Sequence, residues 1–404
     1  MNNWNKILGG SLLIAGTTIG AGMLALPIVT ATSGFYPTLA VFVLAWLFML
    51  ASGMLILEAN LWFSDRINLL SMTRATLGFS GYGIALAMFL LLLYSVNAAY
   101  ITGAASLLTV ALDSWLPHHS LLATLLAIVM GAIVFFGTRT VDYTNRILMT
   151  GLVLSYLILI GFIAPSVDVF HYTQGDPRYL PGTWIIVVLS FAYQFVIPGI
   201  RTYIGSNTKH LMAAICIGSV IPLILYIIWT GAILGSIPLE GEHGLLALRE
   251  GGEPVGGLSN SLNAALNVTW VGQAVGMFSL CALITSILGV SWSMVGLLYD
   301  ITKVEGYNAA RHLGFVLITF IPPLLFALFF QKGFEIALRY AGIFVAVLLG
   351  LMPPLMVWAG RYKKNLAKPG DFRVWGGKTT LRIVIILSSL LIILEIAQLY
   401  GWLE

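Results

Sequence analysis

Residues 15–27 read AGTTIGAGMLALP and lie in the middle of the first long apolar run, which extends from Ile7 to Thr32. Gly16, Gly20 and Gly22 fall within this stretch, and each weakens a helix by about 1 kcal/mol relative to alanine. The stretch therefore predicts a membrane helix that is interrupted near its middle, where free N–H groups and the following half-helix would hold a carboxylate. The alternative is that the glycines serve close packing between helices.

The rest of the chain is equally apolar. Of its 404 residues, 59% are hydrophobic and only 9% are charged, and the mean hydropathy is +0.95. Soluble domains have about 45–50% apolar and about 25% charged residues. The chain has too few polar groups to cover a water-soluble surface, which excludes a large soluble helical protein. The pI of about 9.0 reflects basic loops, so we expect a lipid bilayer and no nucleic acid as partner.

Eleven apolar runs are long enough to cross the roughly 30 Å hydrocarbon core of a bilayer. Backbone groups in lipid must be paired within a helix, and the alternating segments of about 10 residues that build a membrane barrel are absent. We therefore predict an all-α membrane protein of about 11 transmembrane helices. The runs are 7–32, 35–63, 81–112, 121–137, 146–164, 183–203, 211–237, 268–300, 313–330, 333–358 and 381–403.

Basic residues indicate the orientation. If the N-terminus is cytoplasmic, only four of the 20 lysines and arginines fall on the opposite side. These are Arg178, Arg249, Lys332 and Arg339. We expect a multi-pass protein of the cell inner membrane with a cytoplasmic N-terminus and a periplasmic C-terminus. The longest outer loop, from Pro238 to about Asn267, either caps the outer vestibule or is a solvated linker.

A second interruption is predicted in the sixth span, where residues 191–199 read FAYQFVIPG. Pro198 lacks a backbone donor and clashes with the preceding turn of a helix. Interrupted helices at corresponding positions of two halves are a sequence indication of a transporter site. We expect a single domain, 1–404, with two inverted five-helix repeats at about 7–166 and 183–358 and an extra helix at about 381–403.

Polar groups at membrane depth are costly, so each needs a reason. Tyr94 and Asn97 share one face of the third span, and they either bind substrate or form interhelical hydrogen bonds. The neighbouring hydroxyls of Thr285 and Ser286 either serve a ligand or donate back to their own helix. Glu395 in the last span has no obvious partner.

Two other classes of membrane protein fit the sequence less well. A channel needs a continuous polar pore or a ring of charge, whereas the polar groups here are isolated. An enzyme needs a convergent set of His, Asp or Cys residues, and the six histidines lie mostly in loops. We therefore expect neither enzymatic activity nor a cofactor, and no metal site.

Three stretches resemble the hydroxy and aromatic amino acid permease family, particularly its tyrosine-specific permeases. They are residues 15–27, residues 285–290, which read TSILGV, and residues 319–329, which read TFIPPLLFALF and are followed by YAG at 340–342. The similarity runs along nearly the whole chain. This family is similar to the wider amino acid, polyamine and organocation superfamily, which implies the leucine-transporter fold.

The resemblance implies secondary active import of tyrosine, and also of tryptophan or phenylalanine, usually by proton symport. The substrate-binding residues expected in the first span are Gly16, Thr17, Thr18, Ile19, Gly20, Ala21 and Gly22. From the sixth span, the resemblance adds Phe191 and Tyr193. The residue types themselves lead us to expect Gln194 and Phe195 in the same pocket, and Tyr94 and Asn97 from the third span. The chain departs from the family at 191–195, where many members have a Phe-Gly-Phe-His-Gly pattern, and at Gly296, where an acidic residue is frequent.

The sequence leaves two candidates for the coupling ion, a proton and sodium. In the leucine-transporter fold, a sodium site can lie between the first interruption and the eighth span. The matching groups here are the carbonyls of Gly16 and Ile19 and the hydroxyls of Thr285 and Ser286. A sodium-coupled symporter of another small amino acid is therefore the alternative to proton symport. Glu58 is the nearest candidate for a proton carrier, although its place at the inner end of the second span also suits a capping or gating group.

Overall fold

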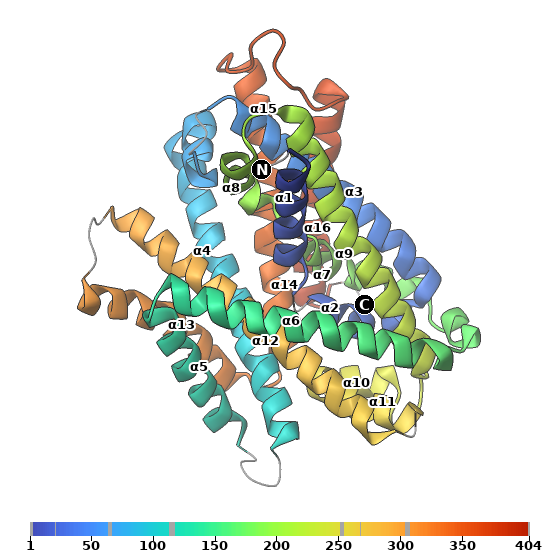
Figure 1. Ribbon diagram of the computed structural model, residues 1–404. Helices are drawn as coiled ribbons and strands as arrows, with labels where there is room; N and C mark the ends of the chain where they lie inside the picture. Colours follow the sequence, from blue (N-terminus) through green and yellow to red (C-terminus); the bar gives the residue numbers. More distant parts are fainter. Residues whose placement is uncertain are drawn as a thin grey trace.

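The computed structural model describes residues 3–20, 22–63, 67–112, 118–250, 254–266, 268–303 and 308–402. All regular elements in these ranges are helical (Figure 1), which confirms the all-α prediction. The α-helices are α1 (Asn3–Thr18), α2 (Gly22–Thr30), α3 (Phe35–Leu61), α4 (Leu69–Ala111), α5 (His119–Phe135), α6 (Thr138–Ile163), α7 (Trp184–Ser190), α8 (Ile197–Ile204), α9 (Thr208–Ser236), α10 (Leu245–Glu250), α11 (Pro254–Leu266), α12 (Thr269–Thr302), α13 (Ala309–Phe329), α14 (Phe334–Val345), α15 (Met352–Tyr362) and α16 (Gly377–Leu399). The predictions that concern Ala21 and Glu404 lie outside the described residues.

The number of membrane-spanning helices agrees with the sequence. Within the described ranges, nine helical segments are long and apolar enough to cross a membrane, and the bent pair of α1 and α2 is a tenth. The eleventh predicted span corresponds to α5, which has 17 residues. At 1.5 Å per residue, α5 is about 26 Å long, a little short of the hydrocarbon core.

Two helices begin eight or more residues before their apolar runs. Helix α6 starts eight residues before the predicted span at Arg146, and its polar first turns contain an ion pair between Arg146 and Asp142 at 2.9 Å. Helix α4 starts at Leu69 and kinks at Gly78, where φ is +79°. Only glycine adopts this conformation readily. Hydropathy shows where a helix meets lipid, not where it begins.

The predicted span 333–358 is not a regular helix. A π-helical turn, η6 (Ala346–Leu351), separates α14 from α15, and Pro353 follows in the first turn of α15. Pro353 has no N–H for the carbonyl of Leu349, four residues earlier. The hydroxyl of Ser52 in α3 donates to this carbonyl instead. A neighbouring helix thus supplies the donor that the proline lacks.

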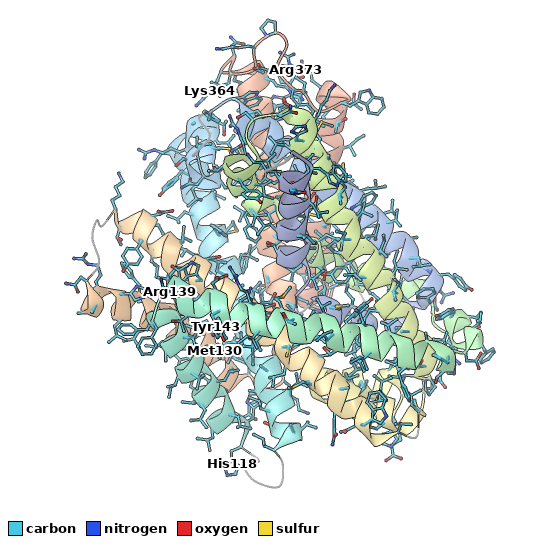
Figure 2. The ribbon with its side chains drawn as sticks, viewed as in Figure 1. His118, Met130, Arg139, Tyr143, Lys364 and Arg373 are labelled. Carbon is cyan, nitrogen blue, oxygen red and sulfur yellow. The ribbon has the colours of Figure 1, made fainter. Side chains whose placement is uncertain are left out.

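Labelled side chains identify the two ends of the bundle. Lys364 and Arg373 lie at the end where α1 begins, and His118 lies at the opposite end (Figures 1 and 2). The long loop predicted to be external contains α10 and α11, which lie at that opposite end. Arg249 in α10 donates to the hydroxyl of Thr32, just beyond α2, at 3.2 Å. The loop is therefore folded against α2, as the capping interpretation requires.

Glu395 has a partner that its sequence neighbourhood does not reveal. It is buried, and Arg339 in α14 donates to its carboxylate at 2.8 Å. Arg339 also pairs with Glu335 at 3.0 Å and donates to the carbonyl of Gly182 at 3.2 Å. Arg249 approaches Glu335 to within 3.8 Å. This network ties α10, α14 and α16 together at the end of the bundle that carries α10.

Glu58 is fully engaged at the other end. Its side chain has no exposed surface, and Arg361 donates to its two oxygens at 2.6 and 2.5 Å. The backbone N–H of Val374 donates to the same carboxylate at 2.7 Å. Glu58 thus joins α3 to α15 and to the segment that follows α15.

Candidate functional site

The first predicted interruption is confirmed. Helix α1 ends at Thr18 and α2 begins at Gly22, and the axis turns by 54° between them. The hydroxyls of Thr17 and Thr18 donate to the carbonyls of Leu13 and Ile14, each at 2.7 Å. These hydroxyls therefore stabilise the last turn of α1 and retain their lone pairs for a ligand.

The second predicted interruption is confirmed as well. Helix α7 ends at Ser190, a single 3-10 turn (Gln194–Val196) follows, and α8 begins at Ile197. Pro198 lies in the first turn of α8, where its missing N–H costs little because these donors have no partner within the helix. The sequence FAYQFVIPG thus ends one half-helix and starts the next.

The two interruptions lie against each other. A Cβ atom added at Gly22 would lie 2.5 Å from Ser190 Oγ and 2.8 Å from Ser190 Cβ. The start of α2 can approach the end of α7 this closely only because residue 22 has no side chain. Elements that are more than 160 residues apart in sequence therefore meet at one point, as the paired interruptions predict.

A central cavity opens at this junction, with a volume of about 100 Å³. Five predicted site residues line it: Thr17, Thr18, Gly20, Gly22 and Phe195. The remaining lining residues come from α4, α7, α12, α14 and the stretch after α7. They are Phe89, Leu92, Leu93, Val96, Tyr100, Ile186, Leu189, Ser190, Ala192, Val290, Leu338 and Val345.

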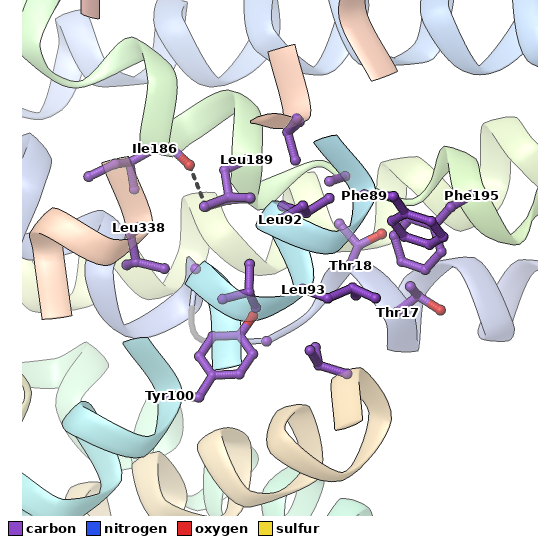
Figure 3. A pocket seen from close by; sticks show the side chains of 17 residues that line it. Thr17, Thr18, Phe89, Leu92, Leu93, Tyr100, Ile186, Leu189, Phe195 and Leu338 are labelled. Atoms are coloured by element: carbon purple, nitrogen blue, oxygen red, sulfur yellow. Dashed lines mark hydrogen bonds between the residues drawn. The ribbon is translucent and has the colours of Figure 1, made fainter. Parts of the chain in front are cut away.

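Aromatic rings line the central cavity in two places. Phe89 and Phe195 lie side by side near Thr17 and Thr18, and Tyr100 and Leu338 lie further along the lining (Figure 3). The ring centroids of Phe89 and Phe195 are 6.3 Å apart, within the range for aromatic pairs. The cavity therefore offers flat apolar surface close to the polar backbone of the interruption.

A second, larger cavity of about 430 Å³ adjoins the first, and we call it the vestibule. The two share Thr17, Gly20, Leu93, Tyr100, Phe195 and Val290. The vestibule extends along α1 to Leu12 and Leu13, and to Asn145 and Met149 in α6. It thus leads from the interruption toward the end of the bundle where α1 begins.

The four groups of the expected ion site all line the vestibule: Gly16, Ile19, Thr285 and Ser286. Thr285 and Ser286 both donate to the carbonyl of Ala282, at 2.9 and 2.8 Å. They therefore donate back to their own helix, as one interpretation of the sequence requires. Each hydroxyl oxygen still keeps lone pairs that could face a cation.

Charge at the site comes from the backbone. In the described part of the chain, no acidic or basic side chain lines the central cavity or the vestibule. The N-terminal end of α2 carries partial positive charge and the C-terminal ends of α1 and α7 carry partial negative charge. A zwitterion is the kind of ligand whose two charges suit such a pair of helix ends.

Two residues expected from the third span lie elsewhere. The hydroxyl of Tyr94 donates to the carbonyl of Ile318 at 3.0 Å, the group that Pro322 in α13 leaves without a donor. Asn97 donates to Ser291 Oγ in α12 at 3.1 Å. Neither lines the central cavity or the vestibule. Both make the interhelical hydrogen bonds that the sequence left as the alternative.

Three residues expected from the sixth span also line neither cavity. Phe191 packs edge-on against Tyr226, and the Tyr193 ring lies against Gly53 in α3. Gln194 is buried, donates to the carbonyl of Met49 at 2.9 Å and accepts from the N–H of Tyr193 at 2.9 Å. The expectation that Gln194 faces the pocket is not met, because its amide joins the broken helix to α3.

Sequence reasoning missed most of the apolar lining. Nothing distinguishes Phe89 or Leu338 from other apolar residues of a membrane helix. Leu93, Val96 and Tyr100 follow the spacing of one helical face, which is a usable indication once Tyr100 is assigned to the site. Ser190 becomes recognisable only when Gly22 is known to touch it.

Comparisons with known proteins agree with this geometry. The tyrosine-specific transport system 1 of Haemophilus influenzae is 33% identical over 99% of this chain and 98% of its own length. The tryptophan-specific transport protein of Pseudomonas aeruginosa is 32% identical over 98% of this chain and 96% of its own.

The fold is similar to that of MhsT, solved in complex with L-phenylalanine, with a TM-score of 0.67 and 14% identity over 96% of this chain and 97% of that chain. This likeness establishes the leucine-transporter fold. The model of the tryptophan/tyrosine permease family matches residues 3–395. The chain belongs to the tryptophan/tyrosine permease family, a family of membrane transporters and not of enzymes.

Proposed function

We propose that this protein is a secondary active transporter that imports aromatic amino acids, with tyrosine as the leading substrate and tryptophan or phenylalanine also carried. The observation that carries the proposal is the central cavity, which joins two interrupted helices and is lined by Phe89, Phe195 and Tyr100. The names of the relatives, which specify tyrosine and tryptophan, and the phenylalanine bound to MhsT support the same substrate class.

The proposed pose follows from the charges of the helix ends. The substrate carboxylate would lie at the start of α2, near Gly20 and Gly22, and the ammonium group near the carbonyls that end α1 and α7. The ring would lie against Phe89 and Phe195, where aromatic pairs are favourable. In this pose the residues in direct contact with substrate are Thr17, Thr18, Gly20 and Gly22, which all line the central cavity.

Alternating access requires that the site open to one side at a time. The vestibule extends along α1 as far as Leu12, toward the end where this helix begins. On the other side of the site, Arg249 and the backbone N–H of Asp176 both bond to Thr32. We propose that this geometry is the inward-facing state of an inner-membrane protein, with the N-terminus cytoplasmic and the C-terminus periplasmic. The two inverted repeats would be 7–166 and 183–358, with 381–403 as the extra helix.

Reporter fusions after Lys6 and Lys364 test this orientation. Both are expected to report a cytoplasmic position. An external signal at Lys364 would contradict the proposed topology of eleven spans.

Proton symport is the proposed coupling, since the family resemblance favours it. Glu58 is a poor proton carrier in this geometry because Arg361 and Val374 occupy its carboxylate. The alternative, a sodium-coupled symporter, is favoured by one observation: Gly16, Ile19, Thr285 and Ser286 line the same cavity. Oxygen ligands of this kind suit a hard cation.

Uptake of radiolabelled amino acids into proteoliposomes tests substrate and coupling together. With a proton gradient imposed, wild-type protein is expected to accumulate tyrosine, and Phe195→Ala to accumulate it with a raised KM. A sodium gradient at fixed pH is expected to drive no uptake. Accumulation of tyrosine driven by a sodium gradient alone would favour the sodium-coupled alternative. The absence of uptake of tyrosine, tryptophan and phenylalanine would refute the proposed substrate class.

A further inference from the structure

Tyr226 in α9 is a fully buried residue whose hydroxyl lies between the two interrupted helices. The hydroxyl oxygen is 2.7 Å from the carbonyl oxygen of Thr18 and 3.1 Å from that of Ser190. Thr18 is the last residue of α1 and Ser190 is the last residue of α7. One side chain from a third helix therefore contacts both half-helices where they end.

These two carbonyls need a donor from elsewhere. The last carbonyls of a helix have no partner within it, and a buried carbonyl without a donor is unfavourable. A tyrosine hydroxyl carries a single proton. The two carbonyls must therefore share one O–H, so the position of each half-helix end depends on the other. The ring of Phe191 packs edge-on against the ring of Tyr226, and the two ring centroids are 5.4 Å apart.

The side chains at these helix ends do not make this connection themselves. The hydroxyls of Thr18 and Ser190 donate to the carbonyls of Ile14 and Ile186, each within its own helix. Both residues line the central cavity, whereas Tyr226 does not. The Tyr226 hydroxyl thus connects the ends of α1 and α7 by hydrogen bonds that their own side chains do not make.

We infer that Tyr226 is a positioning residue of the transport site. Its hydroxyl sets the distance between the end of α1 and the end of α7 without touching the substrate. The inference rests on the proposed function, because it assigns the substrate to the cavity between these ends. Rearrangement of either half-helix has to break or redistribute the shared hydrogen bond, so the residue also biases the site toward the geometry in which both carbonyls are held.

Tyr226→Phe removes the hydroxyl and keeps the ring. Tyr156→Phe is the matched control, since Tyr156 is also buried and donates to one carbonyl, that of Leu225, at 3.2 Å, away from both cavities. In the reconstituted full chain, we expect Tyr226→Phe to raise the Kd for tyrosine about tenfold, which corresponds to about 1.4 kcal/mol. Tyr156→Phe is expected to leave Kd within about twofold, on the same scale. Equal Kd values for the two variants would overturn the inference.

A conservative replacement separates positioning from general stability. With 4-aminophenylalanine at position 226, two N–H donors face the two carbonyls, and we expect wild-type affinity to return. This variant also tests the inference if Tyr226→Phe does not fold. A weakened affinity for tyrosine in the 4-aminophenylalanine variant would contradict the role of the hydrogen-bond donor.

Hydrogen exchange provides a readout that needs no substrate. Peptides that cover residues 14–24 are expected to exchange faster in Tyr226→Phe than in the wild type, and also when residue 226 is replaced by 4-methylphenylalanine. In Tyr156→Phe, the same peptides are expected to exchange at the wild-type rate. Unchanged exchange would overturn the inference even if the protein transports tyrosine. A different pair of results would refute the proposed function alone. In that case the wild-type protein binds none of the aromatic amino acids, while Tyr226→Phe still exchanges faster than the wild type.

Discussion

Gly22→Ala adds a single methyl group at the contact between the two interruptions. The new Cβ would lie 2.5 Å from Ser190 Oγ and 2.8 Å from Ser190 Cβ, closer than packed side chains approach each other. The backbone of Gly22 does not have a positive φ, so alanine fits its conformation. The expected effect therefore comes from the collision with α7 and not from backbone strain.

The magnitude follows from two opposing terms. Overpacking by one methyl group costs about 1–3 kcal/mol, and the better helix propensity of alanine returns up to about 1 kcal/mol. With the middle of the first range, about 2 kcal/mol, the net cost is about 1–2 kcal/mol. This corresponds to roughly 5- to 30-fold in affinity at 1.4 kcal/mol per tenfold. Since α2 begins at this contact, we expect the cost to appear as a raised KM for tyrosine, with membrane insertion intact. The larger Gly22→Val, and likewise Gly20→Val, is expected to abolish transport.

The neighbouring glycines provide a graded series for the assay. A Cβ at Gly16 would meet nothing within 4 Å, whereas one at Gly20 would lie 3.0 Å from Ser286 Oγ. Proteoliposome uptake should therefore show KM unchanged for Gly16→Ala, moderately raised for Gly20→Ala and most raised for Gly22→Ala. Adding Ser190→Gly to Gly22→Ala should restore part of the affinity. Equal KM values across the series would mean that these glycines only pack helices together.

Three further predictions follow from other contacts. Gln194→Leu should destabilise the protein by about 1–3 kcal/mol in thermal unfolding, because it leaves the N–H of Tyr193 unpaired. It should lower the uptake of tyrosine and of phenylalanine equally. A loss specific to tyrosine would place Gln194 in the pocket. Thr285→Ala combined with Ser286→Ala should reduce proton-driven uptake moderately without altering the response to sodium, so sodium-driven uptake that this variant loses would overturn proton coupling. Glu395→Ala should lower stability by about 1–3 kcal/mol, because Arg339 loses a hydrogen-bond partner but keeps Glu335, and an unchanged melting temperature would show that the pair contributes nothing.

The interruptions were predictable because their cause is local. Glycine and proline act on the backbone of their own turn, so Gly20, Gly22 and Pro198 mark the breaks without knowledge of the fold. The spans were predictable for a similar reason, since lipid requires a continuous apolar run. The helical polar turns before Arg146 show where this argument ends, because helix formation outside the hydrocarbon needs no apolar residues.

Side-chain directions at the second break were not predictable. Residues 191–193 are not helical, so the period of 3.6 residues no longer tells which side of the segment faces the cavity. Phe195 reaches the cavity, whereas Gln194 points to Met49 in α3. The partner of Glu395 was equally hidden, because Arg339 lies 56 residues away and on another helix.

The hydroxyls of this protein suggest a better rule for interpreting polar residues in membrane helices. Each break or proline frees a carbonyl, and in lipid that carbonyl needs a donor from a neighbouring helix. Ser52 serves the carbonyl freed by Pro353, Tyr94 serves the one freed by Pro322, and Tyr226 serves the ends of α1 and α7. A polar residue should therefore be assigned to a ligand only after the carbonyls freed nearby have been given their donors. By that test Tyr94 is structural. Thr17 and Thr18 differ, since their hydroxyls donate within α1 and both residues line the central cavity. This test therefore leaves them, as it leaves Ser190, as candidates for the proposed substrate contact.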